Sequence, residues 1–140
     1  DCGKLVLSPT RTYAPIIREI LSSGLKDNVN GIIHCSGGAQ TKVLHFTRDA
    51  SVRIVKDNLF DTPPLFDIIQ TESGTTWKEM YKVFNMGHRM ELYVNPAIAE
   101  EVIEISESFD VDAKIVGRVE QAESTSLEIL TSKGKFNYDV

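Results

Sequence analysis

Residues 90–107, MELYVNPAIAEEVIEISE, contain the clearest consecutive strand and helix in the sequence. Apolar residues alternate with Glu91 and Tyr93 at the start of this stretch, which is the pattern of a half-buried strand. Asn95-Pro96 then supplies a capping side chain and a proline that suits a first helical turn. Apolar residues follow at helical spacing, with glutamates on the other face. The stretch therefore predicts a strand that leads directly into an amphipathic helix.

Similar patterns flank this stretch on both sides. Strands are predicted at 29–35, 51–55, 113–119 and 126–130, helices after Thr12, Thr62 and Thr76, and a short helix at 39–44. The last two strands are expected to form an antiparallel hairpin, followed by a polar tail. Burying all of these apolar faces favours an α/β fold, a mixed β-sheet covered by helices, in one domain spanning residues 1–140.

Composition excludes several kinds of partner. The 15 Lys and Arg residues stand against 20 Asp and Glu residues, and the net charge of -5 disfavours nonspecific binding to nucleic acid or an anionic membrane. Cys2 and Cys35 are too few for a disulfide framework, and no histidine shares metal-ligand spacing with another ligand. We therefore expect no metal site, no membrane span, a cytoplasmic location, and a small molecule or another protein as partner.

A paired glycine turn after the first predicted strand is one candidate binding loop. Residues 33–42, IHCSGGAQTK, combine a strand end, this turn and a helix start. Glycine amides can approach phosphate oxygens closely, and a hydroxyl and an ammonium group lie next to them. The candidate phosphate-binding residues are Ser36, Gly37, Gly38, Thr41 and Lys42. From the pattern alone, a purely structural tight turn is the commoner outcome.

The turn FNMGHR at residues 84–89 is a second candidate. Asn85 and Gly87 suit a helix stop, and Arg89 at the start of a strand can bind a phosphate or carboxylate through two hydrogen bonds. An ordinary helix stop is again the alternative. The apolar stripe on the preceding helix, Trp77, Met80, Tyr81 and Phe84, is expected to pack in the core, and Cys35 is interpreted as a small core residue.

Three stretches together resemble the C-terminal domain of the AIR synthetase family, the phosphoribosylformylglycinamidine cyclo-ligases. They are SPTRTY at 8–13, HCSGGA at 34–39 and EMYKVFNMG at 79–87. These are similar to the family patterns P-T-R-x-Y, H-x-T-G-G-G and E-M-Y-x-x-F-N-x-G-x-G-M in the same order and spacing. The resemblance extends to IVG at 115–117 and covers nearly the whole chain.

The resemblance implies a part in the ATP-dependent cyclisation of formylglycinamidine ribonucleotide to aminoimidazole ribonucleotide in purine biosynthesis. It implies that ATP and Mg²⁺ act in a full-length, homodimeric enzyme whose N-terminal ATP-binding domain is absent from these residues. The chain alone is therefore expected to bind neither cofactor and to be inactive. The substrate would be a phosphorylated small molecule, and the catalytic residues are not predicted within the chain.

Three positions depart from the family pattern. Ala39 replaces the third glycine of the loop, Lys42 replaces an acidic residue, and Arg89 replaces the second glycine of F-N-x-G-x-G. We expect a divergent branch that still makes the same product. The alternatives are a paralogue for another phosphorylated substrate, or a noncatalytic ligand-binding or assembly module that keeps the fold.

Overall fold

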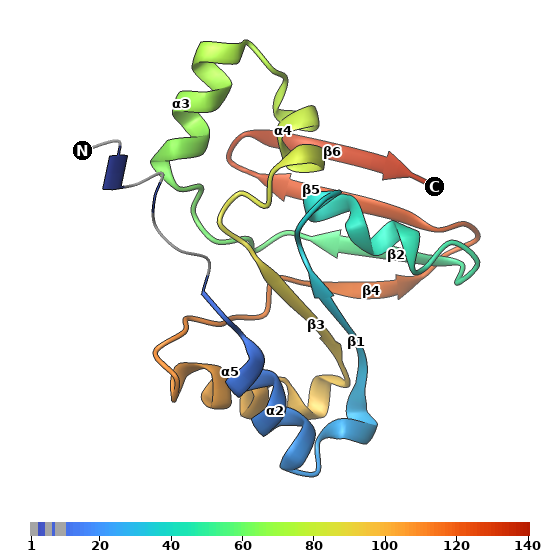
Figure 1. The fold of residues 1–140 in the computed structure, drawn as a ribbon. Coiled ribbons are helices and arrows are strands. Elements are labelled where there is room, and N and C mark those ends of the chain that lie inside the picture. The colour runs from blue at the N-terminus through green and yellow to red at the C-terminus, as the bar shows by residue number, and fades with distance from the viewer. Residues whose placement is uncertain (1–2, 5–6, 8–10) are drawn as a thin grey trace. The chain divides into compact units, whose positions relative to one another are not determined.

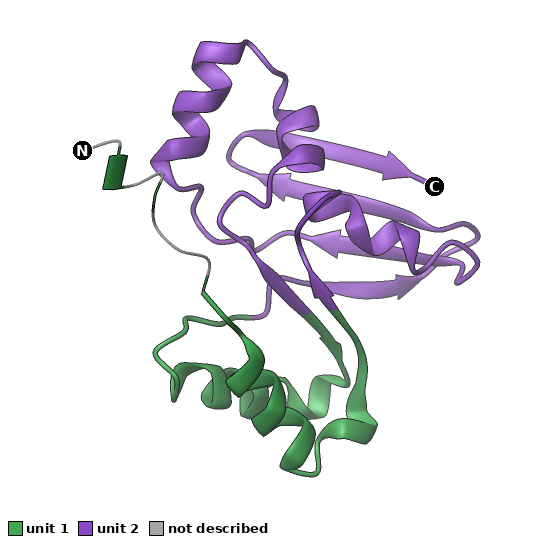
Figure 2. Ribbon diagram, viewed as in Figure 1, with its two compact units in different colours: residues 1–32, 92–114 green, residues 33–91, 115–140 purple. Residues whose placement is uncertain are grey.

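The computed structural model describes residues 3–4, 7 and 11–140 (Figure 1). These residues form two compact units, which are coloured separately in Figure 2. Unit 1 contains residues 1–32 and 92–114, and unit 2 contains residues 33–91 and 115–140. The predicted α/β class with a mixed sheet is confirmed. The single domain spanning residues 1–140 stays a prediction.

Unit 1 is built mainly from helices. They are α2 (Ala14–Ser22), the 3₁₀ turns η1 (Lys26–Asn28) and η3 (Pro96–Ile98), and α5 (Ala99–Glu107). The Asn95 side chain accepts a hydrogen bond from the Ala97 N–H at 3.0 Å, which confirms the predicted cap. Thr12 is not the N-cap of α2, because Tyr13 occupies that position. The core of unit 1 is aliphatic and centres on Ile16, Ile20, Leu25 and Ile98.

Strands β1 (Val29–His34) and β3 (Met90–Val94) form a two-stranded sheet. The Asn95 N–H donates to the Asn28 carbonyl at 2.9 Å near one end, and the Cys35 N–H donates to the Arg89 carbonyl at 2.8 Å near the other. The residue numbers thus rise along one strand and fall along the other, so the pair is antiparallel. Both strands lie where the sequence predicts them.

Unit 2 contains a four-stranded sheet in the order β4-β2-β5-β6. Its strands are β2 (Val52–Lys56), β4 (Gly117–Gln121), β5 (Ser126–Thr131) and β6 (Gly134–Asp139). Strand β2 is antiparallel to β4 and parallel to β5, while β5 and β6 are antiparallel. Ile54 therefore lies between Val119 and Leu127 across the sheet.

Two predictions about this sheet are wrong. The predicted hairpin of the last two strands does not exist, because β2 lies between β4 and β5, and β4 begins only at Gly117. The predicted polar tail is strand β6. Phe136 and Tyr138 alternate there with polar residues, and Gly134 adopts φ +137° at the start of β6, directly after the turn that reverses the chain. This alternation marks a half-buried strand.

Three helical segments complete unit 2: η2 (Ala39–His45), α3 (Pro64–Ser73) and α4 (Trp77–Val83). The Thr76 hydroxyl accepts from the Glu79 N–H at 3.3 Å, which confirms the predicted cap of α4, whereas Pro63 and not Thr62 is the N-cap of α3. Of the predicted core stripe, Met80 and Tyr81 are buried, whereas Trp77 and Phe84 are half-buried. The predicted short helix at 39–44 is a 3₁₀ helix.

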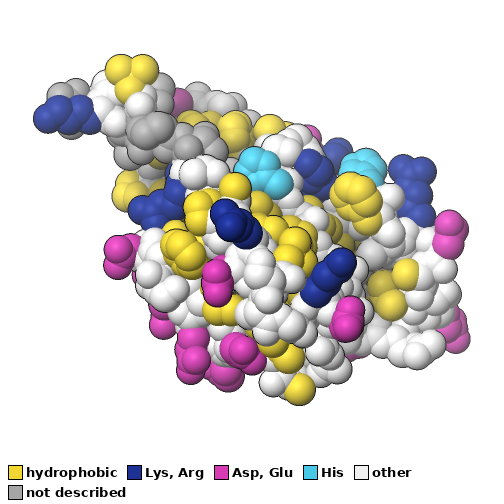
Figure 3. Space-filling view, turned by 60° about the horizontal axis from the view of Figure 1, so that its bottom comes forward, with side chains coloured by type: hydrophobic (Ala, Val, Ile, Leu, Met, Phe, Trp, Pro, Cys, Tyr) yellow, Lys and Arg dark blue, Asp and Glu magenta, His cyan; other side chains and the backbone are white. Residues whose placement is uncertain are grey.

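The surface carries charges of both signs. In the face drawn in Figure 3, acidic and basic side chains are interspersed, with apolar groups between them. Across β2 and β4, Arg53 binds Glu120, and Arg118 binds both Glu120 and Asp57. Within the described residues, no helix is long and apolar enough to span a bilayer.

Candidate functional site

The glycine loop, residues 36–42, leaves two backbone amides available. Ser36 and Gly37 are exposed and Gly38 is half-buried. In the described part of the chain, no backbone carbonyl accepts a hydrogen bond from the N–H of Gly37 or Gly38. The Lys42 ammonium donates to the Ser36 hydroxyl at 2.7 Å, which holds a positive charge beside the turn. This combination can bind an anion.

The backbone of the glycine loop is left-handed at two consecutive residues. Gly38 has φ +85°, and Ala39, which is buried, has φ +43°. A non-glycine residue adopts this region at some cost, which explains why the family pattern has a third glycine at this position. The Thr41 hydroxyl donates to the Gly38 carbonyl at 2.9 Å, so this side chain stabilises the turn.

The second candidate, the turn at residues 85–89, is also tightly fixed. The Asn85 side chain accepts from the Gly87 N–H at 2.9 Å. Gly87 has φ +90°, and a Cβ there would lie 2.8 Å from Pro63 Cδ, so only glycine fits. Arg89 is half-buried, and its carbonyl accepts the Cys35 N–H that precedes the glycine loop.

The side chain of Gln40 connects these two candidate segments. Its Nε2 donates to the Asn85 carbonyl at 2.9 Å and to the His88 carbonyl at 3.4 Å. Gln40 is fully buried in unit 2, immediately after the left-handed residues of the glycine loop. The two segments predicted separately from the sequence are therefore adjacent in space.

A buried ion pair is hydrogen-bonded to Gln40 through Lys56. The Lys56 ammonium binds the Glu91 carboxylate, and their side chains are 2% and 4% exposed. His88 Nε2 lies 3.5 Å from the same carboxylate. Burial, and next the nearby Glu91 carboxylate, raise the pKa of the Cys35 thiol to about 12, so this thiol stays protonated and unreactive at neutral pH. The interpretation of Cys35 as a core residue is confirmed.

The sequence analysis missed Gln40, Lys56 and Glu91. The predicted strand at 51–55 stops before Lys56, yet Lys56 ends β2 on the same face as the buried Ile54. Glu91 was placed on the solvent side of β3, yet it is buried and its apolar neighbours are only half-buried. The only signal in the sequence was that two strands carry residues of opposite charge, Lys56 and Glu91. Lysine and glutamate are rarely fully buried unless they pair with each other.

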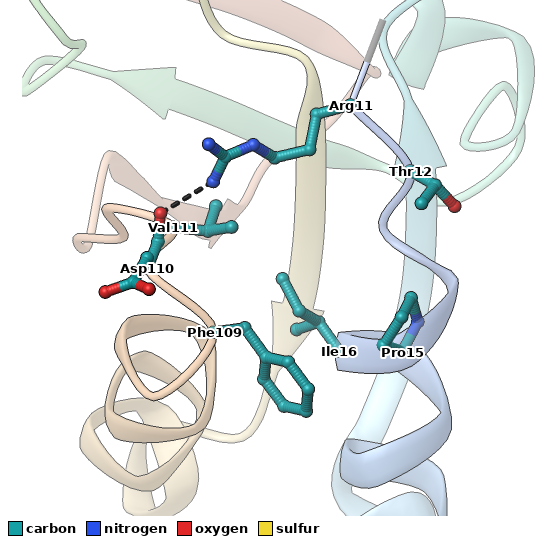
Figure 4. Close-up of a pocket in the computed structure, with 7 residues that line it drawn as sticks. All are labelled: Arg11, Thr12, Pro15, Ile16, Phe109, Asp110 and Val111. Carbon is teal, nitrogen blue, oxygen red and sulfur yellow. Dashed lines mark hydrogen bonds between the residues drawn. The ribbon is translucent and has the colours of Figure 1, made fainter.

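Unit 1 contains a separate pocket of about 320 Å³ (Figure 4). It lies between the start of α2 and the segment after α5, and it is lined by Arg11, Thr12, Pro15, Ile16, Phe109, Asp110 and Val111. The Arg11 guanidinium extends across it and donates to the Asp110 carbonyl at 2.6 Å. None of the predicted site residues lies here. Within the described residues, no group of three or more His, Cys, Asp or Glu side chains is placed to hold a metal ion.

Most of the chain matches a known protein family. The family described as "AIR synthase related protein, C-terminal domain" matches residues 4–129. The chain belongs to this family. The match includes both the glycine loop and the turn at 85–89, and it ends within β5.

Curated relatives carry the same resemblance. The phosphoribosylformylglycinamidine cyclo-ligase of Methanopyrus kandleri is 39% identical over 116 residues, which are 83% of this chain and 32% of that protein. The enzyme of the same name from Methanococcus vannielii is 35% identical over 115 residues, with 82% and 32% covered. The chain therefore spans about a third of the length of these relatives.

A solved structure shares the fold. The hydrogenase maturation protein HypE of E. coli superimposes with a TM-score of 0.64 at 19% identity, covering 91% of this chain and 38% of that chain. At this identity the likeness extends to the fold alone. It agrees with a C-terminal-domain architecture of the AIR synthase related proteins.

Proposed function

We propose that this chain is the C-terminal part of an ATP-dependent cyclo-ligase that converts formylglycinamidine ribonucleotide to aminoimidazole ribonucleotide. The observation that carries the proposal is the family match over residues 4–129, together with the names of relatives at 35% and 39% identity. In this proposal ATP and Mg²⁺ act in the whole enzyme, a cytoplasmic homodimer. The N-terminal domain of that enzyme completes the active site, and the chain alone is inactive.

Within this function, we assign the glycine loop and the turn at 85–89 to binding of a phosphate group of the substrate. The support is local: the amides of Gly37 and Gly38 and the ammonium of Lys42 lie together at an exposed turn. The proposal depends little on a helix dipole, because η2 is a 3₁₀ segment of seven residues. The chain's contribution is therefore substrate positioning and charge stabilisation.

The activity can be tested directly on the proposed full-length enzyme, a longer protein that contains these residues. Incubated with formylglycinamidine ribonucleotide, ATP and Mg²⁺, it is expected to release aminoimidazole ribonucleotide, ADP and phosphate. The 140-residue chain, assayed in parallel, is expected to release none. Product formation by the short chain would overturn its assignment as an incomplete enzyme, and no product from the longer protein would overturn the cyclo-ligase itself.

The phosphate assignment is tested by Gly37→Val. Gly37 lies outside the left-handed region, and a Cβ there meets no atom within 4 Å, so the substitution adds bulk without backbone strain. Gly38 is unsuitable because its φ of +85° would penalise valine by itself. We expect phosphate affinity to fall about tenfold, with a smaller loss in Gly37→Ala. Unchanged phosphate affinity in both variants would mean that the glycines have a purely structural role.

A noncatalytic ligand-binding module, or a paralogue for another phosphorylated substrate, is the second candidate. Lys42 favours it, because a cation stands where the family pattern has an acid and, among the described residues, no carboxylate lies within ion-pair distance of it. Phosphate binding by the chain, with no aminoimidazole ribonucleotide formed by the longer protein, would select this second function.

A further inference from the structure

The glycine loop and the turn at 85–89 come from distant parts of the sequence, so something must fix their spacing. Gln40 is 45 residues from Asn85, yet its side chain reaches the Asn85 carbonyl at 2.9 Å. The same Nε2 lies 3.4 Å from the His88 carbonyl. One buried amide group thus fixes two backbone carbonyls of the turn, those of Asn85 and His88, relative to the glycine loop.

The orientation of the Gln40 amide is set from both ends. Lys56 Nζ donates to Gln40 Oε1 at 3.0 Å, and an ammonium group can only donate. The carbonyl groups of Asn85 and His88 can only accept, so the NH₂ group must face them. A reversed amide would place donor against donor and acceptor against acceptor. Gln40 therefore has one satisfied orientation.

Lys56 is matched to this arrangement in number as well as in kind. Its ammonium has three N–H donors, and it has three acceptors: the Gln40 carbonyl at 2.8 Å, Gln40 Oε1 and the Glu91 carboxylate. Burying two charges costs desolvation free energy, and well-packed apolar residues are often as stable. Stability alone does not explain why the pair contacts Gln40 of the glycine loop and His88 of the turn at 85–89.

We propose that Gln40 is a positioning residue that, held by the Lys56–Glu91 pair, fixes the turn at 85–89 against the glycine loop so that both contact one phosphate group. This inference rests on the proposed phosphate-binding function of the two loops. It predicts that Gln40 affects ligand affinity without itself touching the ligand, because its side chain is fully buried.

The test is a titration of the ¹⁵N-labelled 140-residue chain with inorganic phosphate, followed by NMR at Gly37, Gly38, Gly87 and Arg89. In the native chain, the amides of both loops should shift with a single dissociation constant. Gln40→Met keeps the length and packing of the side chain but removes its hydrogen bonds. We expect phosphate affinity about tenfold weaker and separate responses from the two loops.

Thr125→Val is the matched control. It removes another side-chain hydrogen bond to a backbone carbonyl in unit 2, from the Thr125 hydroxyl to Thr47 at 2.7 Å, and it leaves both loops connected. Phosphate affinity should change by less than about twofold in this control. If Gln40→Met fails to fold, Gln40→Asn serves instead, since its shorter side chain keeps the amide but cannot span the same distance.

The outcomes separate the two ideas. If the native chain responds at both loops and the Gln40 variants bind phosphate as Thr125→Val does, the positioning role is overturned while the binding site stands. If Gly37 and Gly38 do not respond to phosphate in the native chain, the proposed site itself fails, and the positioning role fails with it. A weakened, uncoupled response in the Gln40 variants alone supports the inference.

Discussion

The two units differ in what they bury. The core cluster of unit 1 is aliphatic, whereas unit 2 also buries a polar cluster beside its aliphatic core: Gln40, Lys56, His88 and Glu91. An aliphatic core stabilises through its area and its packing. A buried polar cluster stabilises the folded state only when every member is paired. Its hydrogen bonds then restrict the cluster to a single geometry. The buried polar cluster contacts both segments of the candidate site, because Gln40 belongs to one and bonds to the backbone of the other.

The largest expected effect comes from breaking the buried pair in unit 2. Lys56→Met should lower the free energy of unfolding by about 3–5 kcal/mol, because it leaves the Glu91 carboxylate buried without its cation. The double variant Lys56→Met/Glu91→Leu should recover most of this loss. Urea unfolding of the single and double variants gives both numbers.

Ile20→Ala in unit 1 provides the comparison for that experiment. Ile20 is 1% exposed, so the cavity left by the variant should lower the free energy of unfolding by about 2–5 kcal/mol. Because Ile20 has no charged partner, no second substitution is expected to recover this loss. A Lys56→Met variant that lost less than about 1 kcal/mol would mean that the pair is not a buried unit, and the contrast between the two interiors would disappear.

A smaller loss of stability is expected from a substitution in the turn at 85–89. Gly87→Ala places a Cβ 2.8 Å from Pro63 Cδ at φ +90°, and should cost about 2–4 kcal/mol. Gly74→Ala is the control, since Gly74 also has a positive φ, +65°, but a Cβ there meets nothing within 4 Å. Its cost should be about 1 kcal/mol. Equal losses in thermal unfolding would show that the Pro63 contact is relaxed easily.

Below about pH 9, no pH-dependent change of stability is expected from Cys35, which lies next to the buried polar cluster. Its pKa is raised from 9.0 to about 12, so the folded state favours the neutral thiol. The resulting stabilisation is complete below about pH 9 and is lost as the pH rises from there towards 12. In a Cys2→Ser background, iodoacetamide at pH 8 should label the unfolded chain and leave the native chain unmodified. Rapid labelling of native protein would mean that the cluster opens.

Local signals were sufficient for a large part of the fold. Strands β1 and β3 and helix α4 with its Thr76 cap were predicted because their alternation or capping is contained within a few residues. The position of β2 between β4 and β5 was not predicted, because pairing between strands more than 60 residues apart leaves no local pattern. Strand β6 was missed for a different reason: its polar residues obscured the alternation of Phe136 and Tyr138.

The candidate site divides in the same way. The sequence located the glycine loop and the turn at 85–89, since glycines and a helix stop are local features. It did not identify Gln40, whose importance depends on Asn85 far along the chain, or the pairing of Lys56 with Glu91. Whether these loops bind phosphate stays a prediction.

The central place of β2 has a consequence for the order of events during synthesis. Its partners β4 and β5 lie later in the chain, and β5 ends about 75 residues after β2 does. At typical elongation rates, both edges of β2 remain without their partners for roughly 4–15 s. Ile54 and Val55 are apolar, and Arg53, Lys56 and Asp57 flank them with charge. These charges discourage pairing with other nascent chains until the native neighbours have emerged from the ribosome.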